Sequence, residues 1–163
     1  MVEMKVFGLA LDEDSQVPVL ILKDAEEKRV LPIWIGAMEA MAISLVLNEV
    51  ELPRPMTHDL LLNMITNMEG KLTNVDVVSI REGTYYAELE VEQNGKRKRI
   101  DCRPSDGIAL ALRAGAPISV SLEVLDQAEA DKKPEAEEVI ATNDPDKWAA
   151  LLEKMSTGTK YKM

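Results

Sequence analysis

Charged and hydroxyl side chains gather in the stretch RIDCRPSDGIALALR, residues 99–113. Ile100 to Cys102 has the character of a strand end, Ser105 is predicted to cap a helix, and Asp106 lies in its first turn, where a carboxylate complements the helix dipole. Arg103 stands just before this helix start, whose free N–H groups point outward. Together they predict a site for a phosphate or a carboxylate. A solvent-exposed arginine with no ligand is the simpler alternative.

The only histidine of the chain, His58, lies in a second polar group with Arg54, Thr57 and Asp59. One interpretation makes His58 a proton shuttle or metal ligand, with Asp59 orienting its ring and Arg54 binding phosphate. The other is helix capping, in which Thr57 and Asp59 satisfy free N–H groups and His58 is merely exposed. Both interpretations stay open at this level.

Two acids occupy matching places in the two halves of the chain. A shift that puts Glu39 on Asp106 also puts Ile33 on Ile100 and Ala42 on Ala109. If both helix starts face one crevice, the pair of carboxylates predicts a site for Mg²⁺ or Mn²⁺, which could assist phosphodiester cleavage. The alternative needs no function, because an acid in a first helical turn is favoured by about 0.3–1 kcal/mol.

A dense basic run, residues 96–99, follows the Asn94-Gly95 turn and includes Lys98 and Arg99. Its side chains alternate between the two faces of a strand, so at most two share one side. They could guide a nucleic-acid strand towards Arg103. They could also protect an exposed edge strand from aggregation.

The elements that position these residues follow a repeating order. Alternating apolar runs predict strands over 5–11, 18–22 and 30–35, and again over 74–80, 85–91 and 98–102, each set followed by a helix. Between them, a helix capped by Thr57 and closed by Gly70 carries an apolar face that is predicted to pack on a sheet: Leu60, Leu61, Met64, Ile65 and Met68. The fold class is therefore α+β, a duplicated β-β-β-α unit with a mainly antiparallel sheet and helices packed on one side.

The composition limits the classes of protein to consider. The chain has 163 residues, of which 46% are hydrophobic, and a formal net charge of −10. No run is long enough for a membrane span and no secretory signal opens the chain, so we expect a cytoplasmic protein. The single cysteine, Cys102, excludes an internal disulfide and indicates a buried, inert thiol. The negative charge argues against tight nucleic-acid binding unless a local basic patch or a bound metal makes the contact.

We expect three segments along the chain. Residues 1–125 form the domain, residues 126–143 an acidic linker, and residues 144–163 a short helix and tail. The helix, over 145–155, has one apolar face formed by Trp148, Leu151, Leu152 and Met155. It is predicted to dock on its own domain, on a dimer mate, or on another protein partner.

Three runs in this order resemble a known family: LPIWIGAMEAMAI at 31–43, LPRPMTHDLL at 52–61, and RIDCRPSDGIALALR at 99–113. They resemble the bifunctional nuclease family, long catalogued as a bacterial domain of unknown function. The resemblance covers about Met4 to Leu125. It implies a compact α+β domain, a homodimer, and nuclease activity on DNA and RNA.

The leading hypothesis is therefore a nuclease with little sequence preference. Arg54, Lys98, Arg99, Arg103 and Ser105 would bind phosphate, His58 would be the acid or base, and Glu39, Asp59 and Asp106 would be metal ligands or bases. One alternative is a non-catalytic dimeric scaffold module. Another is a sensor of a phosphorylated metabolite that uses the helix start at Ser105.

Overall fold

The computed structural model describes residues 1–130, which form a seven-stranded sheet and four helices. The predictions for residues 131–163, which include most of the linker and the 145–155 helix, lie outside the described residues. In chain order the elements are β1 (Val2–Leu11), β2 (Pro18–Asp24), β3 (Val30–Trp34), α1 (Ala37–Leu47), α2 (Thr57–Asn67), β4 (Gly70–Arg81), β5 (Thr84–Gln93), β6 (Lys96–Cys102), α3 (Pro104–Ala114), β7 (Ile118–Val120) and α4 (Leu122–Ala130).

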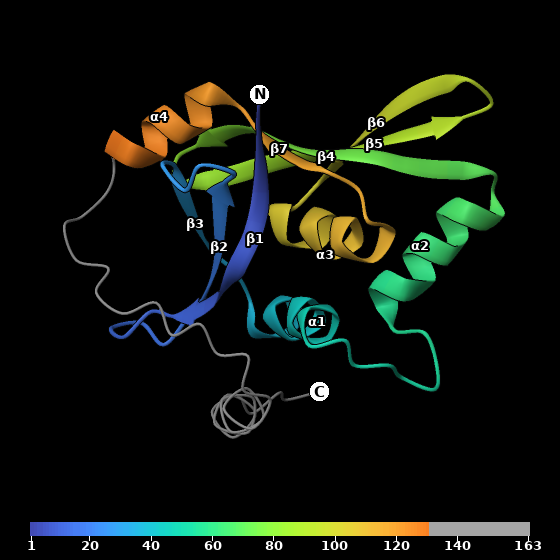
Figure 1. Cartoon of the computed structure of the whole chain (residues 1–163), viewed down its shortest axis with the longest axis horizontal. Helices are drawn as coiled ribbons and strands as arrows, with labels where there is room; N and C mark the ends of the chain where they lie inside the picture. Colours follow the sequence, from blue (N-terminus) through green and yellow to red (C-terminus); the bar gives the residue numbers. More distant parts are fainter. Residues whose placement is uncertain (131–163) are drawn as a thin grey trace.

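The sheet has two halves, with the strand order β3-β2-β1-β7-β4-β5-β6. Each half is an antiparallel meander, and the two are turned away from each other so that α1 and α3 lie in the angle between them (Figure 1). The predicted α+β class with a mainly antiparallel sheet is confirmed. The order β-β-β-α occurs twice, while a duplication of one ancestral unit stays a prediction.

Two tight turns connect the strands of the second half. Glu82 and Gly83 have φ angles of 50° and 76°, and Asn94 and Gly95 have φ angles of 52° and 70°. Positive φ at both central residues matches the right-handed twist of the flanking strands. The Asn94-Gly95 turn predicted from the sequence is confirmed, and the two hairpins place β6 at the edge of the sheet.

Strand β7, which joins the two halves, was not predicted from the sequence. Ile118 and Val120 are buried and Ser119 points the other way. The strand pairs antiparallel with β1 and parallel with β4. Three residues are too short for an alternating pattern to stand out, so only tertiary pairing identifies this strand.

The core lies between the sheet and the paired helices α1 and α3. Alternate residues of β4 and β5 face inward, and Ile108 of α3 is fully buried against them. Ile43 of α1 is fully buried in the same core, in a helix that packs on α3 and β2. Gly107 allows α3 to approach closely, because a Cβ there would lie 2.8 Å from Val75 Cγ1. The start of α3 is thereby fixed against the sheet.

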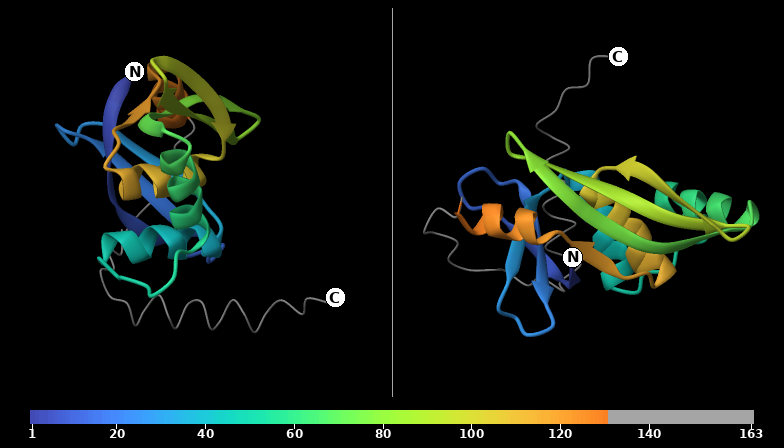
Figure 2. Two further views of the ribbon diagram at one scale, coloured as in Figure 1. Left: turned by 90° about the vertical axis from the view of Figure 1, so that its right-hand side faces the viewer. Right: turned by 90° about the horizontal axis from the view of Figure 1, so that it is seen from above.

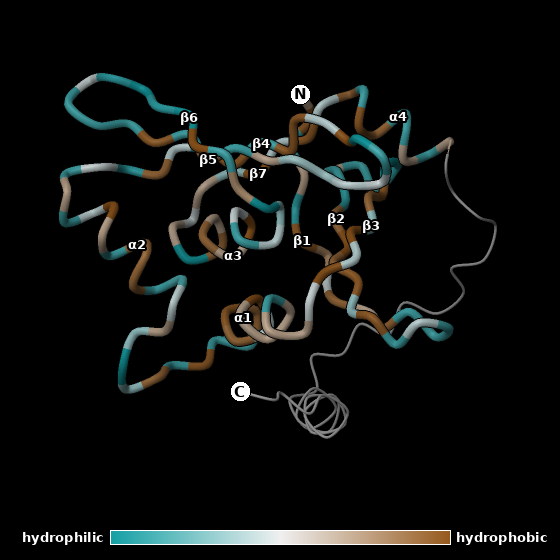
Figure 3. Tube along the Cα trace, turned by 180° about the vertical axis from the view of Figure 1, so that it is seen from behind, coloured by the Kyte–Doolittle hydropathy of each residue, from teal (hydrophilic) through white to brown (hydrophobic). Residues whose placement is uncertain are grey.

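Helix α2 lies at the open end of the angle and differs from its prediction. Its N-cap is Met56, so Thr57 is the first helical residue rather than the cap, and the left-handed residue after the helix is Glu69 rather than Gly70. Only one side of α2 packs, through Leu62 and Ile65, against α3 and β4. Figure 3 shows hydrophobic, brown segments along α2. Four of its apolar side chains, which we call the α2 stripe, remain exposed: Leu60, Leu61, Met64 and Met68.

Helix α4 contacts β3 and β4 and adds Val124, Leu125 and Ala128 to the same core. It continues to Ala130, so residues 126–130, predicted as the beginning of a linker, are helical. Within residues 1–130, no helix has the length and hydropathy to cross a membrane.

Candidate active site

The first turns of α1, α2 and α3 bring together four side chains, which we call the Asp106 cluster: Glu39, His58, Arg103 and Asp106. Asp106 is its centre. One carboxylate oxygen, Oδ1, lies 3.0 Å from His58 Nε2, and the other, Oδ2, lies 2.6 Å from Arg103 Nε. The left view of Figure 2 shows α2 running in front of α3, with α1 beneath. Residues that are far apart in the sequence therefore meet at one point.

Arg103 bridges the two predicted carboxylates. As the N-cap residue of α3 it has an extended backbone, and its side chain reaches over the first turn. Nη2 lies 2.9 Å from Glu39 Oε1 and 3.1 Å from Asp106 Oδ1. Nη1 has no acceptor within the described residues, and the side chain is 65% exposed. One end of the guanidinium is therefore free to bind an anion from solvent.

His58 contacts Asp106 through one ring nitrogen only. The side chain is 14% exposed, and Nδ1 has no partner in residues 1–130. The only buried side-chain nitrogen or oxygen atom without a partner in that range is Ser79 Oγ, so His58 Nδ1 reaches the surface. An Asp106 carboxylate that accepts from Nε2–H leaves Nδ1 as the basic nitrogen.

The electrostatics keep Asp106 ionised. Burial would raise the pKa of its carboxyl, but hydrogen bonds from Arg103 and His58 outweigh burial and lower that pKa below its ordinary value. The same Asp106 contact, together with Glu39, raises the pKa of Arg103. The cluster thus holds a permanent anion and a permanent cation beside one imidazole.

A second ion pair, the Asp59–Arg113 pair, lies on the other side of α2's first turn. Arg113 Nε is 2.6 Å from Asp59 Oδ1, while Nη1 donates to Ala109 O and Nη2 to Ala42 O. Asp59 also accepts from the Met56 backbone N–H at 2.8 Å. Arg113 ties α1, α2 and α3 together and so positions His58. The sequence analysis did not identify this role, although an arginine in the last turn of an apolar helix is a signal that could have prompted it.

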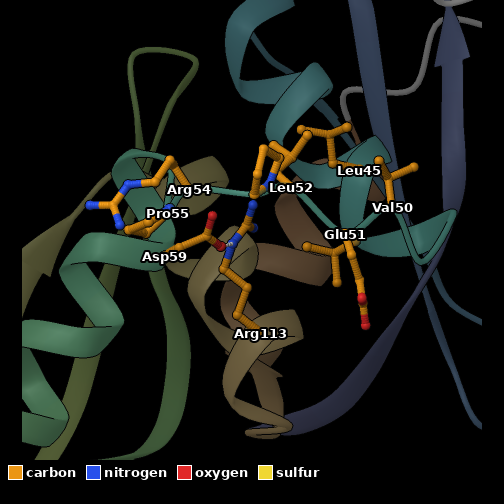
Figure 4. A pocket seen from close by; sticks show the side chains of 10 residues that line it. Leu45, Val50, Glu51, Leu52, Arg54, Pro55, Asp59 and Arg113 are labelled. Carbon is orange, nitrogen blue, oxygen red and sulfur yellow. Dashed lines mark hydrogen bonds and ion pairs between the residues drawn. The ribbon is translucent and has the colours of Figure 1, made fainter.

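A cavity of about 410 Å³ lies above this pair, between the end of α1, the 48–56 loop and the beginning of α2 (Figure 4). Arg54 stands at its rim, exposed, and makes no hydrogen bond or ion pair with the rest of the described chain. The other lining residues are mostly apolar: Leu45, Val46, Val50, Glu51, Leu52, Pro53, Pro55, Asp59 and Arg113. Arg54 remains available for an anion at this cavity.

Three other predicted phosphate-binding residues are placed differently. Ser105 is not the N-cap of α3; it is the second helical residue, and it is only 6% exposed. Arg99 lies on the opposite face of the sheet from the core, 3.0 Å from Glu88 and 3.5 Å from Asp76. Lys98 donates to Gln93. The basic run thus does not join the Asp106 cluster.

The predicted metal ligands, Glu39 and Asp106, converge, but on Arg103. Within residues 1–130 no three His, Cys, Asp or Glu side chains gather closely enough to hold a metal ion. A divalent cation between Glu39 and Asp106 would have to displace a guanidinium. As they are arranged, these residues do not fit Mg²⁺ or Mn²⁺.

Cys102 lies at the end of β6, half-buried beside the cluster. Burial and the negative charge of Asp106 raise the pKa of its thiol to about 11. The thiol is therefore protonated at neutral pH, as expected for an inert cysteine.

Comparison with known proteins agrees with the family resemblance carried by the three sequence motifs. The sequence profile described as the bifunctional nuclease domain matches residues 20–133. Two uncharacterized proteins from two strains of Mycobacterium tuberculosis are 40% identical over 160 residues, 94% of this chain and 94% of each relative. Bifunctional nuclease 2 of Arabidopsis thaliana is 29% identical over 94 residues, 56% of this chain and 29% of the plant protein. Bifunctional nuclease 1 of the same plant is 27% identical over 118 residues, 70% of this chain and 36% of its own length.

Proposed function

Since the chain belongs to the bifunctional nuclease domain family, we propose that it cleaves phosphodiester bonds of nucleic acids at the Asp106 cluster. The observation that carries this proposal is the pairing, through one carboxylate, of a surface-reaching imidazole nitrogen with a guanidinium that has a free end. The imidazole can move a proton and the guanidinium can hold a phosphate.

Each residue of the cluster has a distinct role in this proposal. Asp106 fixes the His58 tautomer and orients Arg103. Glu39 holds Arg103 from the other side. Arg103 binds the non-bridging oxygens of the scissile phosphate through Nη1, and Arg54 binds a neighbouring phosphate. Asp59 acts through Arg113 and the α2 start, as a positioning residue.

The substrate range follows from the same groups. Arginine and histidine in this arrangement recognise phosphate rather than base edges, so we propose cleavage of both DNA and RNA with little sequence preference. The net charge of −10 indicates weak binding of the polymer, with affinity that falls as salt rises. No step in this proposal is routed through a metal ion.

The test is a cleavage assay with purified protein on labelled single- and double-stranded DNA and RNA, in EDTA, Mg²⁺ or Mn²⁺. Wild-type protein is compared with the His58→Ala/Asp106→Ala double variant, and Arg81→Ala is the control for an exposed arginine outside the cluster. Cleavage by wild type and by the control, but not by the double variant, is the expected result. Equal cleavage by all three would reject the assigned residues and indicate a contaminating nuclease.

A second candidate function, a non-catalytic module that self-associates, is favoured by the α2 stripe. Leu60 and Met64 are 53% and 52% exposed, and none of the four stripe residues is charged. In a chain of net charge −10, two copies can approach along a neutral stripe with less repulsion than along an acidic face. The occupant we propose for this face is a second copy, which would form a homodimer.

The mass in solution tests this second candidate. Wild-type protein should sediment as a dimer and the Leu60→Glu/Met64→Glu variant as a monomer. Leu122→Glu, which changes an equally exposed leucine on α4, should leave the dimer intact. A monomeric wild type at micromolar concentration would reject the second candidate and leave the proposed nuclease activity unaffected.

A further inference from the structure

The position of Arg103 between Glu39 and Asp106 affects which mechanism the site can use. We infer that the Asp106 cluster cleaves RNA without a divalent metal, by attack of the 2′-hydroxyl on the adjacent phosphate. This inference rests on the proposed function and specifies its chemistry for one class of substrate. It begins from the mismatch between the cluster and a metal site.

The guanidinium of Arg103 occupies the place where a metal would bridge Glu39 and Asp106. It carries a permanent positive charge and is held on two sides by carboxylates, so its position is fixed before substrate binds. A preorganised cation of this kind stabilises the extra negative charge that a phosphate develops in the transition state. Arg103 can therefore supply the electrostatic role usually given to a divalent ion.

The second requirement is a base for the nucleophile. His58 offers Nδ1 at the surface, while Asp106 holds Nε2 and stabilises the imidazolium that forms when Nδ1 takes up a proton. This is one imidazole, with no second histidine in the chain. It can remove a proton from one oxygen and return it to another.

RNA is the nucleic acid that requires the fewest catalytic groups in addition to the Arg103 guanidinium and the His58 imidazole. Its 2′-hydroxyl is covalently placed next to the phosphorus, so the enzyme does not have to bind and orient a water molecule. Cleavage of DNA must use an external nucleophile, for which the described residues provide no metal cluster. The site is thus better suited to RNA than to DNA.

The step balances without a further reactant. His58 Nδ1 accepts the proton of the 2′-hydroxyl, O2′ forms a bond to phosphorus, and the bond from phosphorus to O5′ breaks. The protonated His58 returns its proton to O5′. The products are a 2′,3′-cyclic phosphate on one fragment and a 5′-hydroxyl on the other, and His58 ends in its starting state.

The experiment uses the full chain in EDTA with three labelled oligonucleotides of one sequence. The first is DNA with a single ribonucleotide, the second has a 2′-O-methyl group at that nucleotide, and the third is all DNA; an all-RNA strand is run in parallel. In EDTA we expect the all-RNA strand and, at its ribonucleotide, the first oligonucleotide to be cleaved much faster than the methylated and all-DNA strands. The fragment ends, identified by mass spectrometry, should be a cyclic phosphate and a 5′-hydroxyl.

Variants connect the reaction to the cluster. His58→Ala should lower the rate by roughly 10²–10⁴-fold, and Arg103→Ala by roughly 10²–10³-fold. His58→Gln keeps a hydrogen-bond donor to Asp106 but removes the basic nitrogen, and it should be as slow as His58→Ala. This variant therefore distinguishes loss of the catalytic base from loss of folding. Arg81→Ala, outside the cluster, should cleave at the wild-type rate.

Other results would contradict the inference, the proposed function or the role of His58. Fragments ending in 3′-hydroxyl and 5′-phosphate, cleavage of the methylated strand as fast as of the first oligonucleotide, or RNA cleavage that requires Mg²⁺ or Mn²⁺ would overturn this inference and leave the proposed nuclease function standing. No cleavage of RNA or DNA with or without metal would overturn the proposed function and the inference with it. Wild-type rates in His58→Gln would overturn the role of His58.

Discussion

The Asp106 cluster and the Asp59–Arg113 pair are built from the same chemistry in two different environments. In each region an aspartate pairs with an arginine, which lies at the N-cap of α3 in the cluster and within α3 in the pair. The two regions also share the start of α2, because His58 belongs to the cluster and the next residue, Asp59, to the pair. Arg113 is 8% exposed and each of its three nitrogens donates to an acceptor. Arg103 is 65% exposed and keeps Nη1 free.

The difference separates structure from function. An arginine whose nitrogens are all satisfied by the protein can only hold elements together, whereas one with an open end can exchange that end between water and a ligand. The two regions are also connected, because Arg113 fixes the helix turn that carries His58. We therefore expect changes at Arg113 to act on stability and changes around Asp106 to act on activity.

The largest predicted effect is on activity. Asp106→Asn should lower the cleavage rate by at least roughly 10²-fold, because the amide can donate to His58 Nε2 and so place the imidazole proton on Nδ1. Initial rates on RNA measure this effect. Asp59→Asn, the matched change in the other region, should retain more activity, and an equal loss in both would show that the two regions are not functionally distinct.

The next effect is on stability. Arg113→Met should lower the free energy of unfolding by about 1.5–3 kcal/mol, since it removes the charged partner of Asp59 and the hydrogen bonds to Ala109 O and Ala42 O. Arg103→Met should cost only about 0–1 kcal/mol, because its ion pairs are exposed to water. Urea denaturation monitored by circular dichroism gives both values. Similar costs at the two positions would contradict the distinction drawn above.

The Asp59–Arg113 pair should contribute to the pH dependence of stability. The Arg113 hydrogen bond, with the Met56 N–H, lowers the pKa of Asp59 in the folded state. A lowered folded pKa adds stability that is present above the unfolded pKa of about 3.9 and is lost as pH falls through the folded value. The pKa of Asp106 is also lowered in the folded state, but burial of its carboxyl opposes part of this lowering.

Unfolding free energies between neutral pH and acid therefore test the two regions separately. Asp59→Asn should be less stable than wild type at neutral pH and should lose less stability on acidification. Asp106→Asn should change the acid dependence less. The reverse order would show that Asp106 is the more strongly stabilised carboxylate.

The smallest effect concerns the thiol beside the cluster. Because the pKa of Cys102 is raised to about 11, alkylation by iodoacetamide at pH 8 should be slow. Burial is the main cause and Asp106 adds to it, so Asp106→Asn should speed alkylation modestly. Mass spectrometry of the intact protein follows the reaction, and an unchanged rate would mean that the Asp106 charge does not reach the thiol.

Local patterns predicted much of the fold, whereas contacts between distant segments escaped prediction. The alternation in β4 and β5 and the Asn94-Gly95 turn are properties of neighbouring residues, and the structure confirms them. Glu39 and Asp106 in first helical turns were likewise visible. The partners of Arg113 lie 54 and 71 residues away, at Asp59 and Ala42, where no spacing rule applies.

The errors near the site have a physical cause as well. A hydroxyl residue next to a helix start favours capping on average, but Pro104 after Arg103 makes α3 begin two residues earlier than predicted, and Ser105 is buried in its first turn. The charged run of β6 was predicted to lie at a sheet edge, which it does. The acidic partners of Arg99 depend on the register between β6 and β5, which could not be predicted from the sequence.

The short strand β7 has a consequence for how the chain reaches this structure. Both halves of the sheet are meanders of neighbouring hairpins, and such local contacts form early. Their union depends on residues 118–120, which pair with β1 on one side and β4 on the other. During synthesis on a ribosome, the inner edges of both half-sheets stay open until these three residues emerge, which makes that interval the time of greatest exposure to misassembly.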